Sequence, residues 1–213
     1  MIAAPSRVNA TRVLIALNVI AYLWCSFTGA SFISGFPDNQ SLVDHGALYG
    51  PFVAQGQWWR IISSGFLHEG LLHIGLNMFA LYQVGTLVEY LMGARRMLLV
   101  YFIAMIGSGL AVVWFSFNQP TLGASGAIFG LFGALVAIGL QLGQRGRSLI
   151  MQVLPIIGIN LVFGFSVPGI SNAAHIGGLL SGFVAGLIVF MTVPRQIVAA
   201  DYINEPAVNA EHE

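Results

Sequence analysis

The chain is short of charge. Only 8% of its 213 residues are charged, whereas a soluble domain carries about 25%. Lysine is absent, and the 8 basic residues are balanced by 8 acidic ones, so no basic surface for nucleic acid is expected. With 57% hydrophobic residues and a mean hydropathy of +0.82, the chain cannot cover a surface that faces water. We therefore expect a membrane protein that contacts the lipid bilayer.

Cysteine is nearly absent too. Cys25 stands alone, which excludes an intrachain disulfide and a metal cluster built on cysteine. No repeat of about 20 to 50 residues is present, nor the inverted halves of many transporters. The first apolar stretch follows Arg7 and Arg12 and lacks a small-residue cleavage site, so we expect it to be retained as a span. No cofactor and no metal site are expected.

Long apolar runs dominate what is present. A helix needs roughly 17 to 25 residues to cross a hydrocarbon core of about 30 Å. The sequence predicts an all-α membrane protein, a single domain over residues 1–213 with its core at 11–193 and a polar tail at 194–213. The connector at 31–62 contains Trp58 and Trp59 and is expected to lie in the membrane interface. The six predicted spans lie at about 11–30, 67–91, 96–117, 124–141, 149–167 and 172–193.

Arginines are sorted to one side of these runs. Arg7 and Arg12 precede the first run, Arg195 follows the last, and two pairs lie in the connectors after the second and fourth. Arg60 alone falls on the other side. Because short loops rich in arginine stay in the cytoplasm, we expect both termini inside.

Four polar residues stand out inside the runs, where such side chains are expensive and by default functional. His73 and Asn77 are four residues apart and share one helical face. Ser125 begins the fourth run, and His175 lies near the start of the sixth. In the expected orientation the second, fourth and sixth runs all start outside, so these side chains share the outer third of the membrane.

This combination fits nucleophilic catalysis. A serine hydroxyl needs a base that takes its proton, and histidine is the usual base. Ser125 and His175 supply the two, while His73, Asn77 and the Ser125 amide can donate to the oxyanion formed when a peptide carbonyl is attacked. No acidic residue lies near His175 in the sequence, so we expect a Ser–His dyad rather than a triad.

Glycines recur every three or four residues along the fourth and sixth runs. Such stripes let helix backbones approach closely. Close approach is what a hydrogen bond of about 2.6–3.2 Å between Ser125 and His175 requires. The two stripes consist of Gly126, Gly130 and Gly133, and of Gly178, Gly182 and Gly186.

From about residue 56 to 186 the sequence resembles the rhomboid family of intramembrane serine proteases. The resemblance implies a rhomboid-like bundle of the simple six-span bacterial type, located in the inner membrane of a bacterium. It also implies Ser125 as nucleophile, His175 as base, and His73, Asn77 and the Ser125 amide as the oxyanion site. The motifs that carry it are Trp59-Arg60, His68, His73, Asn77, Glu89, Gly123-Ala-Ser125-Gly126 and Ala174-His175-Ile-Gly-Gly.

The resemblance also implies roles for the residues around the dyad. Arg60 and Glu89 resemble the family's structural polar pair, which links the first connector to the bundle. Phe129, one turn after Ser125, would pack against the His175 ring. His68 is expected to be structural or to line the cavity, and Gly123 and Gly126 flank the nucleophile.

The activity implied is hydrolysis of a peptide bond in or near the transmembrane segment of another membrane protein. Substrate entry is expected at the fifth run and the connector at 165–171, where proline and glycine loosen the helix. The substrate, the cleavage site and the oligomeric state stay open.

Other readings remain. A catalytically silent rhomboid-like protein would bind membrane helices without cutting them, although such proteins generally lack the Ser or the His. A small channel or transporter would be expected to show acidic or inverted-repeat features, which are absent. His73 and Asn77 could simply join helices, and His68, His73 and His175 could form a three-histidine metal site, which nothing else supports.

Overall fold

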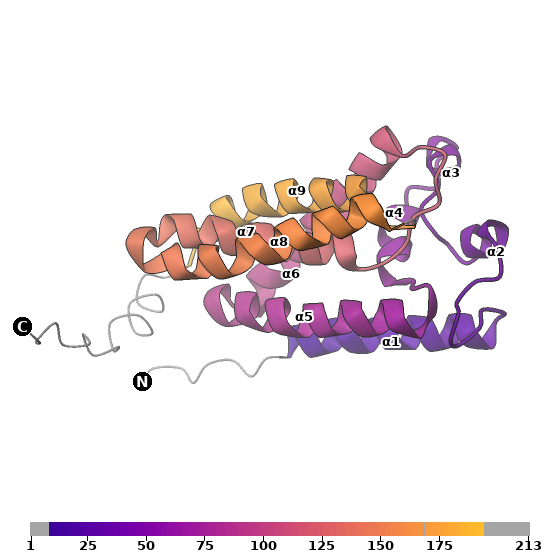
Figure 1. Ribbon diagram of the computed structural model, residues 1–213, viewed down its shortest axis with the longest axis horizontal. Helices are drawn as coiled ribbons and strands as arrows, with labels where there is room; N and C mark the ends of the chain where they lie inside the picture. Colours follow the sequence, from indigo (N-terminus) through magenta and orange to yellow (C-terminus); the bar gives the residue numbers. More distant parts are fainter. Residues whose placement is uncertain (1–8, 168, 194–213) are drawn as a thin grey trace, which may run out of the picture.

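The computed structural model describes residues 9–167 and 169–193, and this part of the chain is helical. The long helices run side by side along the long axis of the molecule (Figure 1). Their ends lie within about three residues of the predicted runs, while the predicted tail at 194–213 lies outside the described residues. The long helices are α1 (Ala10–Phe27), α5 (Gly70–Met92), α6 (Ala94–Phe115), α7 (Ser125–Gln141), α8 (Arg147–Ser166) and α9 (Asn172–Phe190).

Five helical stretches of the described chain are long and apolar enough to cross a membrane. They are α1, α5, α6, α9 and the stretch Gly143–Ser166, which contains the short 3-10 helix η2 (Gly143–Gly146) and α8. The fourth predicted span, α7, is apolar but has only 17 residues, so its length alone does not establish a crossing. Other helices bury 13 of the 17 residues of α7, so most of this helix does not face lipid.

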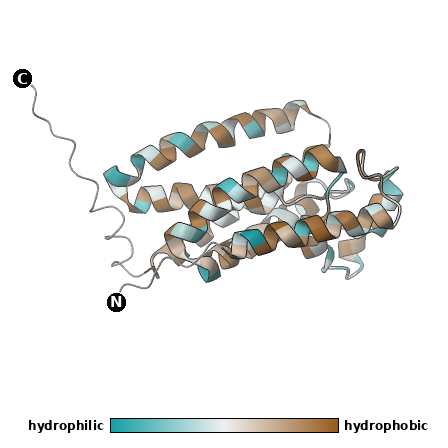
Figure 2. Cartoon of the chain, turned by 90° about the horizontal axis from the view of Figure 1, so that it is seen from below, coloured by the Kyte–Doolittle hydropathy of each residue, from teal (hydrophilic) through white to brown (hydrophobic). Residues whose placement is uncertain are grey.

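The core of the bundle lies around α7. This helix packs most extensively against α9, and α6 packs against both. On the other side α1 and α5 pair with each other. α8 contacts α7 and α9 but buries only Val153 and Ile157 among its own residues. Brown, apolar residues dominate the long helices in Figure 2, as expected of surfaces that face lipid.

The connector between α1 and α5 folds over one end of the bundle, which we call the loop end. It contains α2 (Asn39–Asp44), α3 (Gly50–Ala54), α4 (Arg60–Ser63) and the 3-10 helix η1 (Ser64–Phe66). Leu48 and Thr121 exchange two backbone hydrogen bonds of 2.9 Å, so the connector is tied to the segment that leads into Ser125. The loop end therefore helps to place the start of α7.

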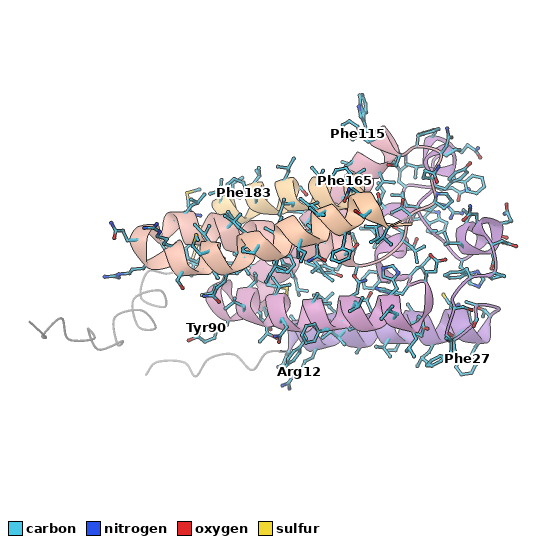
Figure 3. The ribbon with its side chains drawn as sticks, in the orientation of Figure 1. Arg12, Phe27, Tyr90, Phe115, Phe165 and Phe183 are labelled. Atoms are coloured by element: carbon cyan, nitrogen blue, oxygen red, sulfur yellow. The ribbon has the colours of Figure 1, made fainter. Side chains whose placement is uncertain are left out.

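The two ends of the bundle differ in chemistry. Arg12 and Tyr90 lie toward the end opposite the loops, whereas Phe27 lies at the loop end (Figure 3). At the opposite end Arg96 donates from Nη2 to the backbone oxygen of Thr192, at 2.7 Å, and from Nε to its hydroxyl oxygen, at 2.9 Å. These bonds join the start of α6 to the residues that follow α9.

Candidate active site

Ser125 and His175 meet across the interface of α7 and α9. The Ser125 Oγ and His175 Nε2 atoms lie 3.0 Å apart, although 50 residues separate the two in sequence. When the neutral ring carries its proton on Nδ1, Nε2 accepts the hydroxyl proton in this hydrogen bond. The His175 Nδ1 atom is buried without a hydrogen-bond partner in the described part of the chain. This geometry fits a nucleophile and a base, with no carboxylate of the described residues bonded to the second ring nitrogen.

The His175 ring is held by stacking. It lies parallel to the Phe129 ring, with the centroids 4.1 Å apart and an interplanar angle of 8°. Phe129 comes one helical turn after Ser125, so both side chains of α7 face the same ring. The contact expected of Phe129 is present. It orients the His175 ring, to which no acidic side chain of the described residues is hydrogen-bonded.

Backbone contact between α7 and α9 sets the short distance. A Cβ atom on Gly178 would overlap the carbonyl oxygen of Gly126, and one on Gly182 would overlap the backbone of Gly130. A Cβ on Gly186 would lie 2.7 Å from the Cα of Ala134. The glycine stripes predicted from the sequence thus form one continuous contact, in which any side chain would force the helices apart.

His73 reaches the same place from α5. Its Nδ1 atom accepts a hydrogen bond from the Glu69 backbone amide at 3.2 Å, so the neutral ring carries its proton on Nε2. Gly123 has a positive φ of 115°, and a Cβ there would lie 2.9 Å from His73 Nε2 and 3.9 Å from Ser125 Oγ. The His73 N–H donor and the Ser125 hydroxyl therefore face one small region, which only glycine at position 123 leaves open.

Asn77 lies one turn further along α5 and is buried. Its Nδ2 atom donates to the backbone oxygen of His73 at 3.0 Å, which leaves one amide proton free. The described residues show no hydrogen bond from His73 or Asn77 to either member of the dyad. What the structure brings together directly is Ser125, His175 and Phe129, with His73 beside Gly123.

Comparisons with known proteins identify the family of the chain. The family model described as "Rhomboid domain" matches residues 55–192. The chain belongs to the rhomboid family. It is 40% identical over 176 residues to rhomboid protease GluP of Bacillus subtilis, covering 82% of this rhomboid chain and 34% of the relative. With several apolar helices of spanning length, the chain is an integral membrane protein.

Relatives from Arabidopsis thaliana extend the comparison. The mitochondrial RHOMBOID-like protein 6 is 37% identical over 159 residues, 73% of this chain and 52% of the relative. A protein named inactive RHOMBOID-like protein 8 is 36% identical over 126 residues, 58% of this chain and 36% of the relative. The rhomboid chain thus spans between a third and about half of the length of these relatives.

His68 lies beside the site of this rhomboid rather than in it. The side chain is 2% exposed, its Nδ1 atom lies 3.3 Å from the backbone oxygen of Phe66, and its ring meets that of His73 edge to face at 5.1 Å. Among the described residues no group of three His, Cys, Asp or Glu side chains is placed to hold a metal ion. His68 therefore packs behind His73.

Arg60 does not pair with Glu89. Its Nη1 atom donates to the backbone oxygens of Val43, at 2.6 Å, and Ala47, at 2.9 Å, within the connector. Burial lowers the pKa of Arg60, which Asp44 partly counteracts. Among the described residues the expected polar link between connector and bundle is thus absent as a direct contact, because Arg60 forms its hydrogen bonds within the connector.

Glu89 instead fastens the start of α1 to α5. Its carboxylate accepts hydrogen bonds from the backbone amides of Asn9, Ala10 and Thr11 at 2.9–3.1 Å, and from the Thr11 hydroxyl at 2.7 Å. It therefore caps a helix that has no side-chain cap of its own. Sequence reasoning missed this role because the cap comes from about 80 residues away, beyond the reach of local capping signals.

Proposed function

We propose that this rhomboid is an intramembrane serine endopeptidase with a Ser125–His175 dyad. The observation that carries the proposal is the 3.0 Å separation of Ser125 Oγ and His175 Nε2 across two helices in backbone contact. A relative named as a protease adds support. The substrates are membrane proteins that are cut in or near a transmembrane segment.

The chemistry follows from the positions of the protons. Ser125 Oγ attacks the carbonyl carbon of the substrate while its proton moves to His175 Nε2. The resulting oxyanion accepts hydrogen bonds from the Ser125 backbone amide, the His73 Nε2–H and the free Asn77 amide proton. His175 then donates its proton to the departing amine as the peptide bond breaks. Water, deprotonated by His175 Nε2, then attacks the acyl carbon, and His175 returns the proton to Ser125 Oγ as the ester bond breaks.

The proposal includes an orientation. We infer that α7 crosses the membrane as a sixth span and that the loop end faces outward from the inner membrane of a bacterium. Arg12, Arg96 and Arg147 lie at helix ends opposite the loop end, where the positive-inside rule places cytoplasmic residues. Water then reaches Ser125 from the outside, and the connector at 31–62 lies in the interface.

Substrate must also enter from the lipid. We infer that it passes beside α8, which is the least buried long helix and contains Pro155, whose ring removes a helical hydrogen bond. The predicted connector at 165–171 continues from this helix; its residue 168 lies outside the described residues.

A fluorophosphonate probe tests the activity. The purified chain should be labelled, a Ser125→Ala variant of equal melting temperature should not, and only the former should cut a single-span substrate. One relative is named inactive, so the same experiment must also distinguish a protease from a catalytically silent rhomboid-like protein. Equal labelling of both proteins, or no labelling of a folded wild type, would support a rhomboid-like protein that binds helices without cutting them.

A further inference from the structure

Asn160 places an amide on the outer surface of α8. The residue is exposed, and its Nδ2 atom donates to the backbone oxygen of Ile156, one turn earlier, at 2.8 Å. Its Oδ1 atom and second amide proton have no partner within the described residues. An unpaired amide is costly in hydrocarbon, and lipid tails offer nothing to bond it.

The amide lies at the edge of the face by which α8 packs on the bundle. At about 100° per residue, Asn160 is turned by about 60° from buried Ile157, toward exposed Ile156 and Phe163. A chain segment lying along this edge would contact α8 and the bundle together. The other edge of the face carries exposed Leu154 and Phe165, which cannot form side-chain hydrogen bonds.

Asn160 also lies toward the loop end of its helix, as the residues of the candidate active site do. It lies six residues before the loop end of α8, or about 9 Å, and Asn77 lies seven residues from the loop end of α5, or about 10 Å. One turn after Asn160, a Cβ on Gly164 would overlap the side chain of Asn172, the first residue of α9. α8 therefore touches the start of the helix that carries His175.

We propose that Asn160 is a binding subsite for the backbone of a substrate segment that has unwound beside α8. An intact helix has no free backbone groups at this depth, whereas an unwound segment exposes both N–H and C=O groups. The amide supplies one acceptor and one donor, which matches an extended peptide. This inference rests on the proposed protease function and adds to it a residue of α8 that would hold the unwound segment.

The test compares two substrates in vesicles of phosphatidylethanolamine and phosphatidylglycerol. One is a synthetic single-span polypeptide with glycine and proline near its cut site. The other is a short soluble peptide that ends soon after the same cut. Asn160→Ala and Asn160→Leu should lower kcat/KM on the single-span substrate about 3- to 20-fold, the range expected for one hydrogen bond in a membrane. Asn160→Gln, which keeps the amide, should retain more activity than either.

Two readouts separate the inference from a structural effect. Fluorophosphonate labelling and cleavage of the short peptide should stay at wild-type rates in every Asn160 variant. The matched control is Gln152→Leu, an exposed amide of the same helix that donates to the Ser148 hydroxyl at 3.2 Å and lies about 21 Å from the loop end. Its cleavage of the single-span substrate should not change.

Three results would contradict the inference. Unchanged or faster cleavage of the single-span substrate by Asn160→Ala overturns the inference and leaves the protease function standing. Faster cleavage would mean that the smaller side chain only loosens the packing of α8. A photocrosslinker at Ile156 that captures a second copy of the chain, and never the substrate, overturns it as well. Equal inactivity of wild type and Ser125→Ala overturns the proposed function, and this subsite with it.

Discussion

The substitution Gly178→Ala tests whether backbone contact between α7 and α9 sets the catalytic distance. The new Cβ would overlap the carbonyl oxygen of Gly126 and lie 2.7 Å from its carbonyl carbon. An ordinary carbon–carbon contact is about 3.5 Å or more, so the helices must separate by about 1 Å. The Ser125–His175 distance would then rise from 3.0 Å toward about 4 Å, beyond hydrogen-bond reach.

We expect kcat/KM to fall by about 100-fold, because a misplacement of about 1 Å costs that much in a positioned site. Overpacking should also lower the free energy of unfolding by about 1–3 kcal/mol. The assays are cleavage of the short peptide and the rate of fluorophosphonate labelling, with thermal unfolding measured alongside. Gly75→Ala is the control, since a Cβ there meets nothing within 4 Å. A folded Gly178→Ala protein that is labelled at the wild-type rate would refute the reasoning.

Three further predictions address other parts of the site. Asn77→Ala should lower kcat about 100-fold with little loss of stability, because its free amide proton would bind the oxyanion. Single-turnover kinetics measure this rate, and a much smaller decrease would contradict the role. Glu89→Gln weakens the cap of α1 and should cost about 1–2 kcal/mol in unfolding experiments, while kcat of the folded protein stays the same. A disulfide between cysteines placed on α5 and α8, in a Cys25→Ala background, should suppress cleavage of the single-span substrate more than cleavage of the short peptide. Equal cleavage rates of the single-span substrate with and without reductant would contradict entry beside α8.

Local patterns in the sequence were sufficient for much of the fold. Apolar runs predict the long helices because a spanning segment is recognisable by its length and composition alone. The glycine stripes of α7 and α9 predict their close packing for a similar reason, since the spacing of small residues lies within one helix. Ser125 and His175 could be paired from the sequence because both lie near the starts of runs that the arginine pattern predicts to begin on the same side.

Other features depend on contacts that no local pattern carries. The short helices of the connector bury small clusters around Phe36 and Leu48, whose packing partners lie far apart in the sequence. The proton position on His73 depends on the backbone amide of Glu69, and α1 is capped by Glu89 from another helix. The burial of 13 of the 17 residues of α7 likewise depends on helices that lie elsewhere in the sequence.

The central claim is that Ser125 is a nucleophile activated by His175 within the bundle. The most direct measurement is the rate of fluorophosphonate labelling of the full chain and of the folded variants Ser125→Ala and His175→Ala. The account predicts labelling of the wild type at Ser125 alone, none in Ser125→Ala, and a rate in His175→Ala lower by at least about 100-fold, the scale of general base catalysis. Labelling of His175→Ala at the wild-type rate would contradict it.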